Sequence, residues 1–234
     1  LGCELFERTT RQLSVTEAGL RLRPHARQLI DDAERSGAVA RGDHGTPPYE
    51  LTVGTRFELG LSWLTPALSV LEQAVPERTV HLFMGDSPDL MGRVERGELD
   101  AVVFSARITS PRVRYAVLHP ERYRFVGAPG LPAIGDPTDV MGLTLLDVTP
   151  DLPLFRYMQD AGDRAALWPF ARYQYLGGIG AIRARAIAGA GVAVLPEYFV
   201  RNDLDTGALV DLAPNVDIPE DVFRLVWRKD HPLT

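Results

Sequence analysis

Residues 49–104 read YELTVGTRFELGLSWLTPALSVLEQAVPERTVHLFMGDSPDLMGRVERGELDAVVF, and this stretch decides the fold. Apolar and polar residues alternate over 49–53 and again over 80–84, which is typical of strands with one buried face. Two segments with helical spacing, 59–74 and 87–96, separate the strands. The apolar run that ends the stretch suits a strand buried on both faces. The order β-α-β-α-β predicts a parallel sheet with right-handed crossovers.

Within this stretch the side chains that face the core follow from the helical spacing. Leu61, Leu64, Leu68 and Leu71 fall on one face of the first helix. In the second helix we expect three residues to point inward, namely Leu90, Met91 and Val94.

The second half of the chain repeats this plan with a weaker pattern. The predicted strands are Arg124–Ala128, Leu143–Val148, Arg172–Leu176, Val192–Leu195 and Phe223–Trp227. The predicted helices are Leu154–Ala161 and Gly180–Ala188. Two β/α lobes in one chain predict a cleft between them, with ligands bound at the loops beyond the carboxyl ends of the strands.

A single amphipathic helix precedes the first lobe. Ser14 and Glu17 have the spacing of a capping box, and Thr16 is a second candidate for the N-cap. An apolar stripe then recurs at helical spacing through Leu22, Ala26, Leu29, Ile30 and Ala33. The breaker-rich residues 42–48 predict a linker. The helix either folds back on the lobes or binds a partner, and the linker favours the partner.

Composition limits the classes of protein to which the chain can belong. The 234 residues are 45% apolar and 24% charged, which excludes disordered, collagen-like and disulfide-scaffold chains. No apolar run is long enough to span a bilayer, and the acidic residues near the N-terminus exclude a signal peptide. A single cysteine cannot form an internal disulfide. We therefore expect a soluble, cytoplasmic protein.

Charge is uneven along the chain. Residues 1–41 carry a formal charge of +1 and the remaining residues carry −7, which together give the net charge of −6. An acidic surface repels phosphates, so this distribution argues against nucleic-acid binding by the lobes themselves.

Known catalytic and metal-binding signatures are absent from the sequence. The five histidines and the one cysteine lack metal-ligand spacing, and we expect no metal and no cofactor. The glycines Gly177, Gly178 and Gly180 precede a predicted helix. They form either an anion-binding nest or an ordinary strand-to-helix turn.

Several predicted strands are followed by residues that could line a ligand site. They are Thr55, Arg56, Phe57 and Glu58 after the first strand, Asp86 and Ser87 after the second, Ser105 after the third, and Asp147, Val148 and Thr149 in the second half. Each one alone is commonly an N-cap or turn residue. Their convergence on one cleft predicts a binding site.

Short motifs across nearly the whole chain resemble one family. LFERTTR at residues 5–11, LSVTEAG at 13–19 and PHAR at 24–27 look like the end of the DNA-binding domain and the linker helix of LysR-type transcriptional regulators. GELD at 97–100, GAGVAVLP at 189–196, GALV at 207–210 and RKDHP at 228–232 are similar to the effector domain of that family.

The resemblance implies an α/β fold: a two-lobed effector domain like a type 2 periplasmic-binding protein, preceded by a linker helix and the remnant of a winged helix-turn-helix. The implied parts are the wing (1–15), the linker and dimerisation helix (16–41), a hinge (42–48) and the effector domain (49–234). Lobe I would comprise 49–125 and 197–234, and lobe II would comprise 126–196, with crossing strands near Phe125 and Pro196. The resemblance further places a helix-turn-helix before Leu1 and a last helix after Thr234, so that the chain reads as a fragment.

Positions carried over from the family predict three sets of functional residues. The effector-binding set is Thr55, Arg56, Phe57, Glu58, Ser87, Ser105, Val148, Thr149, Gly178 and Ile179. Arg8 and Arg11 would contact the DNA backbone, although two arginines alone would give this chain weak DNA binding at most. Leu22, Ala26, Leu29 and Ala33 would pair with the same helix of a second subunit, in a homodimer or a homotetramer.

Glu58 departs from the family pattern, because many members have Ser or Thr at this position to hold an effector carboxylate. A fixed carboxylate would repel an anionic effector. We therefore hypothesise an effector with an amine or hydroxyl groups, contacted by Phe57. Alternatively, Glu58 pairs with Arg56 or caps its helix and leaves the preference unchanged.

The function implied by the resemblance is that of a regulator that binds double-stranded promoter DNA and is switched by a small effector. A stand-alone solute-binding protein of the same fold is the alternative, although the wing-like residues 5–19 speak against it. An enzyme on this fold is a third reading, disfavoured because no acid/base pair or nucleophile is evident.

Overall fold

The computed structural model describes residues 2–8, 13–41, 48–85, 87–162 and 168–231. The chain divides into two compact units, which are described separately below. Unit 1 comprises Leu1–Leu118 and Phe223–Thr234, and unit 2 comprises His119–Val222. These boundaries, after Leu118 and after Val222, differ from the predicted crossings near Phe125 and Pro196.

Unit 1 begins with a hairpin and a long helix. Strands β1 (Phe6–Arg8) and β2 (Leu13–Val15) pair antiparallel, and helix α1 spans Glu17–Ala40. Thr16 is the N-cap residue, because its hydroxyl oxygen accepts a hydrogen bond from the backbone N–H of Gly19 at 3.0 Å. The alternative with Ser14 as the cap is wrong, since Ser14 is a β2 residue paired with Glu7.

Gly19 fixes the junction between the hairpin and α1. A Cβ atom at this position would lie 2.3 Å from the backbone oxygen of Leu5, closer than atoms can approach. The same junction is closed by Thr16, whose hydroxyl donates to the backbone oxygen of Glu4 at 2.7 Å. The motif at residues 13–19 therefore encodes a tight contact between strand and helix.

A five-stranded sheet forms the body of unit 1, in the order β4-β3-β5-β12-β6. Its strands are β3 (Tyr49–Thr55), β4 (Arg78–Met84), β5 (Ala101–Phe104), β6 (Val113–Glu121) and β12 (Asp221–Arg228). Strand β3 runs parallel to both β4 and β5, which confirms the predicted β-α-β-α-β order. Strand β12 pairs antiparallel with β5.

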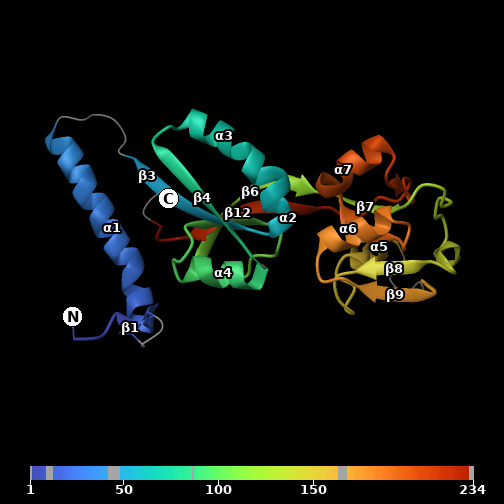
Figure 1. The fold of residues 1–234 in the computed structure, drawn as a ribbon, viewed down its shortest axis with the longest axis horizontal. Helices are drawn as coiled ribbons and strands as arrows, with labels where there is room; N and C mark the ends of the chain where they lie inside the picture. The colour runs from blue at the N-terminus through green and yellow to red at the C-terminus, as the bar shows by residue number, and fades with distance from the viewer. Residues whose placement is uncertain (1, 9–12, 42–47, 86, 163–167, 232–234) are drawn as a thin grey trace. The chain divides into compact units, whose positions relative to one another are not determined.

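Helices lie on both faces of this sheet (Figure 1). Helix α4 (Ser87–Glu95) packs through Leu90 and Val94, which are fully buried as predicted, against β5. The other face is covered by a continuous helical segment made of α2 (Phe57–Leu59), a π-helical turn η1 (Gly60–Leu64) and α3 (Thr65–Ala74).

The π-helical turn η1 changes which side chains this segment buries. In η1 the backbone N–H of Thr65 donates to the oxygen of Gly60, five residues earlier, so the turn holds one residue more than an α-helical turn. Leu64 is buried, whereas Leu61 is 64% exposed. The prediction that these two residues share a buried face is wrong, because the extra residue rotates the face by about 100°.

Unit 2 contains two small sheets and three α-helices among its described residues. Strand β7 (Tyr123–Gly127) lies between β10 (Ala193–Pro196) and β11 (Val210–Asp211), and β8 (Thr144–Asp147) pairs parallel with β9 (Arg172–Tyr175). The helices are α5 (Phe155–Asp160), α6 (Ile179–Ile187), α7 (Glu197–Thr206) and a short 3₁₀ turn, η2 (Pro137–Val140). The core includes an aromatic cluster of Phe125, Phe155, Trp168 and Phe170.

The glycine-rich motif at residues 189–196 is explained by close packing in unit 2. A Cβ atom on Gly191 would lie 2.4 Å from the backbone oxygen of Thr144. Two backbone hydrogen bonds hold the chains at this distance, from Val192 N to Thr144 O and from Leu146 N to Val192 O, both 2.9 Å. Only glycine fits between these strands.

Among the described elements that follow residue 48, four were not predicted, namely β6, η2, α7 and β11. None of the helices described by the structure is both long and apolar enough to cross a lipid bilayer.

Candidate functional site

The carboxyl ends of three strands in unit 1 meet at one edge of its sheet. Thr55 ends β3 and is fully buried, and its hydroxyl donates to the backbone oxygen of Val103 in β5 at 3.0 Å. The backbone oxygen of Thr55 accepts from the N–H of Gly85, the residue after β4, at 3.0 Å. Ser105 follows β5 and is 7% exposed. Thr55 and Ser105 thus lie at the same edge of the unit 1 sheet, and their part in a ligand site stays a prediction.

Two arginines converge on Ser105. Arg56 donates from Nη2 to the hydroxyl oxygen of Ser105 at 3.4 Å, and Arg224 donates from Nη1 to its backbone oxygen at 2.9 Å. Both arginine side chains are half-buried. Tyr115 in β6 lies 6.0 Å from the guanidinium carbon of Arg224, measured to the ring centroid. Unit 1 therefore presents two positive charges at the end of β5.

The other predicted residues of unit 1 have different settings. Phe57 is 54% exposed at the start of the helical segment. Glu58 is half-buried, and its backbone oxygen accepts from the hydroxyl of Ser62 at 2.6 Å. Ser87 is the first residue of α4, but its side chain, like residue Asp86, lies outside the described part of the chain.

In unit 2 the structure brings together two loops that were predicted separately. The N–H of Gly177 donates to the oxygen of Val148 at 3.1 Å, so the loop after β8 contacts the turn before α6. Thr149 is exposed beside this contact, and Gly178 is the N-cap residue of α6. Ile179 is a core residue, 8% exposed.

Asp147 organises the loop after β8. Its carboxylate accepts hydrogen bonds from the backbone N–H groups of Val148, Leu154 and Phe155 at 2.6, 3.3 and 2.9 Å. The side chain is fully buried. Burial raises the pKa of Asp147 above its usual range, and the three N–H donors oppose that shift. In the sequence, the only indication of this role was that Asp147 is an acidic residue at the end of an apolar strand.

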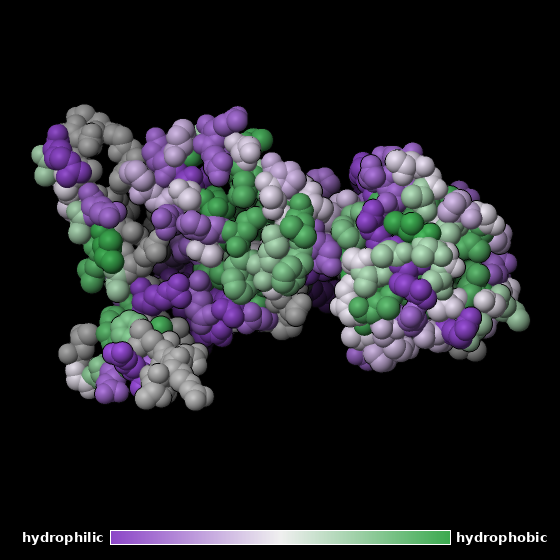
Figure 2. Space-filling view, viewed as in Figure 1, coloured by the Kyte–Doolittle hydropathy of each residue, from purple (hydrophilic) through white to green (hydrophobic). Residues whose placement is uncertain are grey.

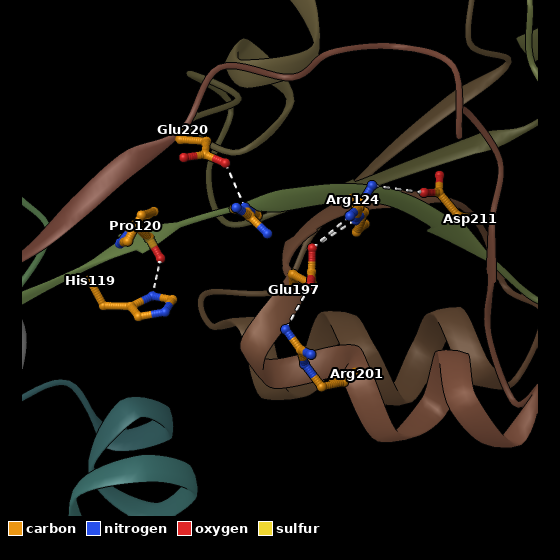
Figure 3. A network of polar contacts seen from close by, with 8 residues as sticks. His119, Pro120, Arg124, Glu197, Arg201, Asp211 and Glu220 are labelled. Carbon is orange, nitrogen blue, oxygen red and sulfur yellow. Dashed lines mark hydrogen bonds and ion pairs between the residues drawn. The ribbon is translucent and has the colours of Figure 1, made fainter.

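A polar network joins β7 to its neighbours in unit 2 (Figure 3). Arg124 contacts Glu197 of α7 at 2.8 Å and Asp211 of β11 at 3.5 Å. Glu197 also pairs with Arg201 at 2.7 Å. Nearby, Arg122 pairs with Glu220 at 2.6 Å, and His119 Nδ1 lies 2.7 Å from the oxygen of Pro120. Because these ion pairs are partly exposed to solvent, each contributes little to the free energy of unfolding.

A second, more buried network lies where the chain enters and leaves unit 2. The rings of Tyr123 and Tyr157 stack with centroids 3.8 Å apart, and the Tyr157 hydroxyl donates to Asp221 at 3.3 Å. Glu121 is 1% exposed and also interacts with Tyr123. Burial, reinforced by the charge of Glu121, raises the pKa of Tyr123 far above its usual range.

The residues predicted for DNA and subunit contacts lie in the hairpin and α1. Arg8 is an exposed residue of β1, and Arg11 falls outside the described residues. On α1, Leu22 and Ala26 are half-buried, whereas Leu29 is 69% exposed and Ala33 is exposed. Figure 2 shows hydrophobic residues at the surface midway along this helix.

The described residues contain no candidate metal site. No group of three or more His, Cys, Asp or Glu side chains in this part of the chain could hold a metal ion.

Arg224 is a residue of the candidate site that was not predicted from the sequence. Its only signal was a positive charge within the apolar strand VFRLVW at residues 222–227.

Comparison with known proteins agrees with this architecture. A family model described as the LysR substrate binding domain matches residues 44–234. The HTH-type transcriptional regulator CrgA of Neisseria meningitidis serogroup C is 25% identical over 221 residues, covering 91% of this chain and 71% of that protein. The HTH-type transcriptional activator IlvY of Salmonella typhimurium is 29% identical over 215 residues, covering 86% of this chain and 70% of that protein.

A solved structure shares the fold. The structure of CrgA, described as a LysR-type transcriptional regulator from Neisseria meningitidis, superposes with a TM-score of 0.66 at 18% sequence identity. The match covers 99% of this chain and 79% of the CrgA chain.

Proposed function

The chain belongs to the LysR family of transcriptional regulators, and on that premise we propose that it serves a DNA-binding regulator that is switched by a small-molecule effector. The family match over residues 44–234 carries this proposal. The hairpin β1–β2 leading into the long helix α1 supports it, because this layout suits the end of a winged DNA-binding domain joined to a linker helix.

In this proposal the effector binds in the cleft between the two lobes. Support comes from each unit separately, since ligands of such sheets bind at the carboxyl ends of strands. Unit 1 offers Thr55, Arg56, Phe57, Glu58, Ser87 and Ser105, and unit 2 offers Val148, Thr149, Gly178 and Ile179. Thr55 and Ile179 are buried, so they would shape the site through their backbone. Binding would shift the balance between two subunit arrangements by its differential affinity for them.

Promoter DNA and a second subunit are the other partners that we propose. Arg8 and Arg11 would contact phosphates of the DNA backbone. We propose a cytoplasmic location, because a regulator must reach the promoter DNA. Leu22, Ala26, Leu29 and Ala33 would pair with the same helix of a second subunit, as a dimer or within a tetramer. The exposed Leu29 supports this, since an apolar side chain gains stability by being covered.

A two-stage experiment tests the proposal. A thermal-shift screen of this chain against metabolites identifies binders, which raise the melting temperature by mass action. The whole regulator is then used to select genomic DNA fragments and to footprint them with and without each binder. We expect at least one binder to change the footprint.

Matched variants separate a true effector from a general stabiliser. Phe57→Ala removes an exposed apolar side chain at the candidate site, and Val70→Ala removes one farther along the same helical segment, on α3. We expect the first variant alone to weaken effector binding. If no binder alters the footprint, the proposed switching is wrong.

A further inference from the structure

We propose that the open edge of strand β6 binds an extended acidic segment of a partner protein, which adds a sixth strand to the sheet of unit 1. Strand β6 is the last strand in the order β4-β3-β5-β12-β6, so among the described strands it pairs with β12 alone. An edge strand presents a row of backbone N–H and C=O groups to which a further strand can bind. The inference goes beyond the proposed function, because neither DNA nor the effector takes part in it.

One backbone contact indicates which residues of β6 face the open edge. The N–H of Lys229, directly after β12, donates to the oxygen of Arg112, directly before β6, at 3.0 Å. The start of β6 therefore meets the end of β12, and the two strands run antiparallel. Successive residues of a strand direct their backbone groups to opposite sides. Because the oxygen of Arg112 faces β12, the backbone groups of Val113, Tyr115 and Val117 face the open edge.

The side chains of β6 suit a strand that gains a neighbour. Residues 114–118 are all exposed. Tyr115 and Val117 are 52% and 60% exposed on one face, and Leu118 is 42% exposed on the other, so a further strand would cover apolar surface on both faces. Pro120 has no N–H, but by the same alternation its nitrogen lies on the side of β12 and leaves the open edge uninterrupted.

Charge complementarity identifies the partner segment as acidic. Arg112 and Arg114 are exposed at the start of β6, and residues 101–120 contain neither Asp nor Glu. At the end of β12 the exposed Lys229 and Asp230 contribute opposite charges, which leaves the two arginines in excess. A second copy of β6 would bring further arginines and no exposed acid. An acidic segment would instead place carboxylates directly opposite the two arginines, which stabilises a strand pair.

The test uses the chain of 234 residues and a synthetic peptide, acetyl-TVTVEVE-amide. In antiparallel pairing its first residue lies opposite Leu118, and its two glutamates lie opposite Arg114 and Arg112, on the same face of the sheet. Fluorescence anisotropy of the labelled peptide gives the dissociation constant Kd. We expect TVTVEVE to bind, and the charge-reversed TVTVKVK to bind at least about tenfold more weakly.

Methylation of the peptide backbone tests whether the peptide binds as a strand. The fourth residue of TVTVEVE lies opposite Tyr115, so its N–H donates to β6, whereas the N–H of the third residue points away. N-methylation of the fourth residue should raise Kd at least about tenfold. N-methylation of the third residue is the matched control and should change Kd by less than about twofold.

Variants of the chain test the charge preference. The double variant Arg112→Glu/Arg114→Glu should reverse it, so that TVTVKVK binds more tightly than TVTVEVE. Its matched control, Arg156→Glu/Arg172→Glu, changes the same charge at exposed positions of unit 2 and should leave the preference unchanged.

A third variant removes a donor from the open edge. Val117→Pro lacks one N–H there and should raise the Kd for TVTVEVE at least about tenfold, while the melting temperature Tm shows that the chain still folds. If Val117→Pro does not fold, the two methylated peptides carry the comparison, since they need no variant.

Three results overturn the inference. The first is equal binding of TVTVEVE and TVTVKVK, or no binding of either at about 1 mM. The second is an equal effect of the two methylations. The third is a dimer, seen by light scattering, that Val117→Pro dissociates, because the occupant of the edge is then a second copy of this chain. None of these results bears on DNA binding or on switching by an effector, which the footprinting experiment tests separately.

Discussion

At the scale of single residues, Asp147 shows how one buried carboxylate fixes a loop. It satisfies three backbone N–H groups that would otherwise lack a partner in a buried setting. Because the loop includes Val148 and leads to Thr149, the carboxylate also positions a proposed part of the effector site.

Asp147→Ala should lower the free energy of unfolding by about 3 kcal/mol, since it leaves buried donors unsatisfied. Urea unfolding measures this change. Asp151→Ala, an exposed acid in the same loop, is the matched control and should cost less than about 0.5 kcal/mol. Equal losses in the two variants would contradict the role given to Asp147.

The buried Tyr123 makes the free energy of unfolding depend on pH in the alkaline range. Burial raises its pKa, so the folded chain keeps this proton above about pH 10 while the unfolded chain releases it. The unfolded state then binds fewer protons, and the free energy of unfolding falls as the pH rises. Tyr123→Phe should flatten this fall between about pH 9 and 11. Tyr175→Phe, which changes a 43% exposed tyrosine, should not flatten it.

At the scale of elements, helices α6 and α7 are joined by one ion pair. Arg183 donates from Nε and Nη2 to the two carboxylate oxygens of Asp203, both at 2.5 Å. Asp203 is 3% exposed, and Arg183 also lies over the ring of Phe199 at 5.6 Å. The aspartate is thus a buried charge that depends on a single arginine fork.

Arg183→Met should lower the free energy of unfolding by about 2 kcal/mol, a value that allows for the partial exposure of the arginine. Arg185→Met, on the exposed side of the same helix, should cost less than about 0.5 kcal/mol. Chemical denaturation of the two variants checks the difference. A negligible effect of Arg183→Met would mean that packing alone joins the helices.

Elements whose apolar residues recur at the spacing of a strand or a helix were predictable from the sequence. Elements that depend on pairing with residues far away in the chain were not. Strand β3 shows the alternation of apolar and polar residues that is typical of a strand with one buried face. Helix α4 shows an apolar stripe at helical spacing. Strand β6 contains Pro120, is exposed along both faces through its seven central residues, and obtains its place only by pairing with β12. Helix α7 is dominated by polar residues, and its buried residues include the charged Asp203 as well as Val200.

The same distinction applies to the candidate site. Thr55 and Ser105 were predictable because strand ends of a parallel sheet meet at one edge. Arg224 lies 119 residues from Ser105 along the chain, and only the antiparallel pairing of β12 with β5 brings them together. No local pattern could have shown that contact.

At the scale of the whole molecule, the apolar stripe of α1 gives the oligomeric state a direct test. Leu29→Glu should convert the proposed dimer to monomer or weaken it at least about tenfold, because a charge would be buried at its centre. Arg23→Glu, on another face of α1, should leave the dimer intact. Light scattering coupled to size-exclusion chromatography measures both. A dimer unaffected by Leu29→Glu would place the subunit contact elsewhere.

The π-helical turn η1 also has a consequence for comparing family members. A turn closed from Thr65 to Gly60 becomes an ordinary α-helical turn when one residue is deleted, and the flanking helices need not move. Relatives with one residue fewer between β3 and β4 should therefore carry their alignment gap within residues 60–64. Any alignment that puts the gap elsewhere would match the exposed side chains of this segment with the buried ones of its relatives.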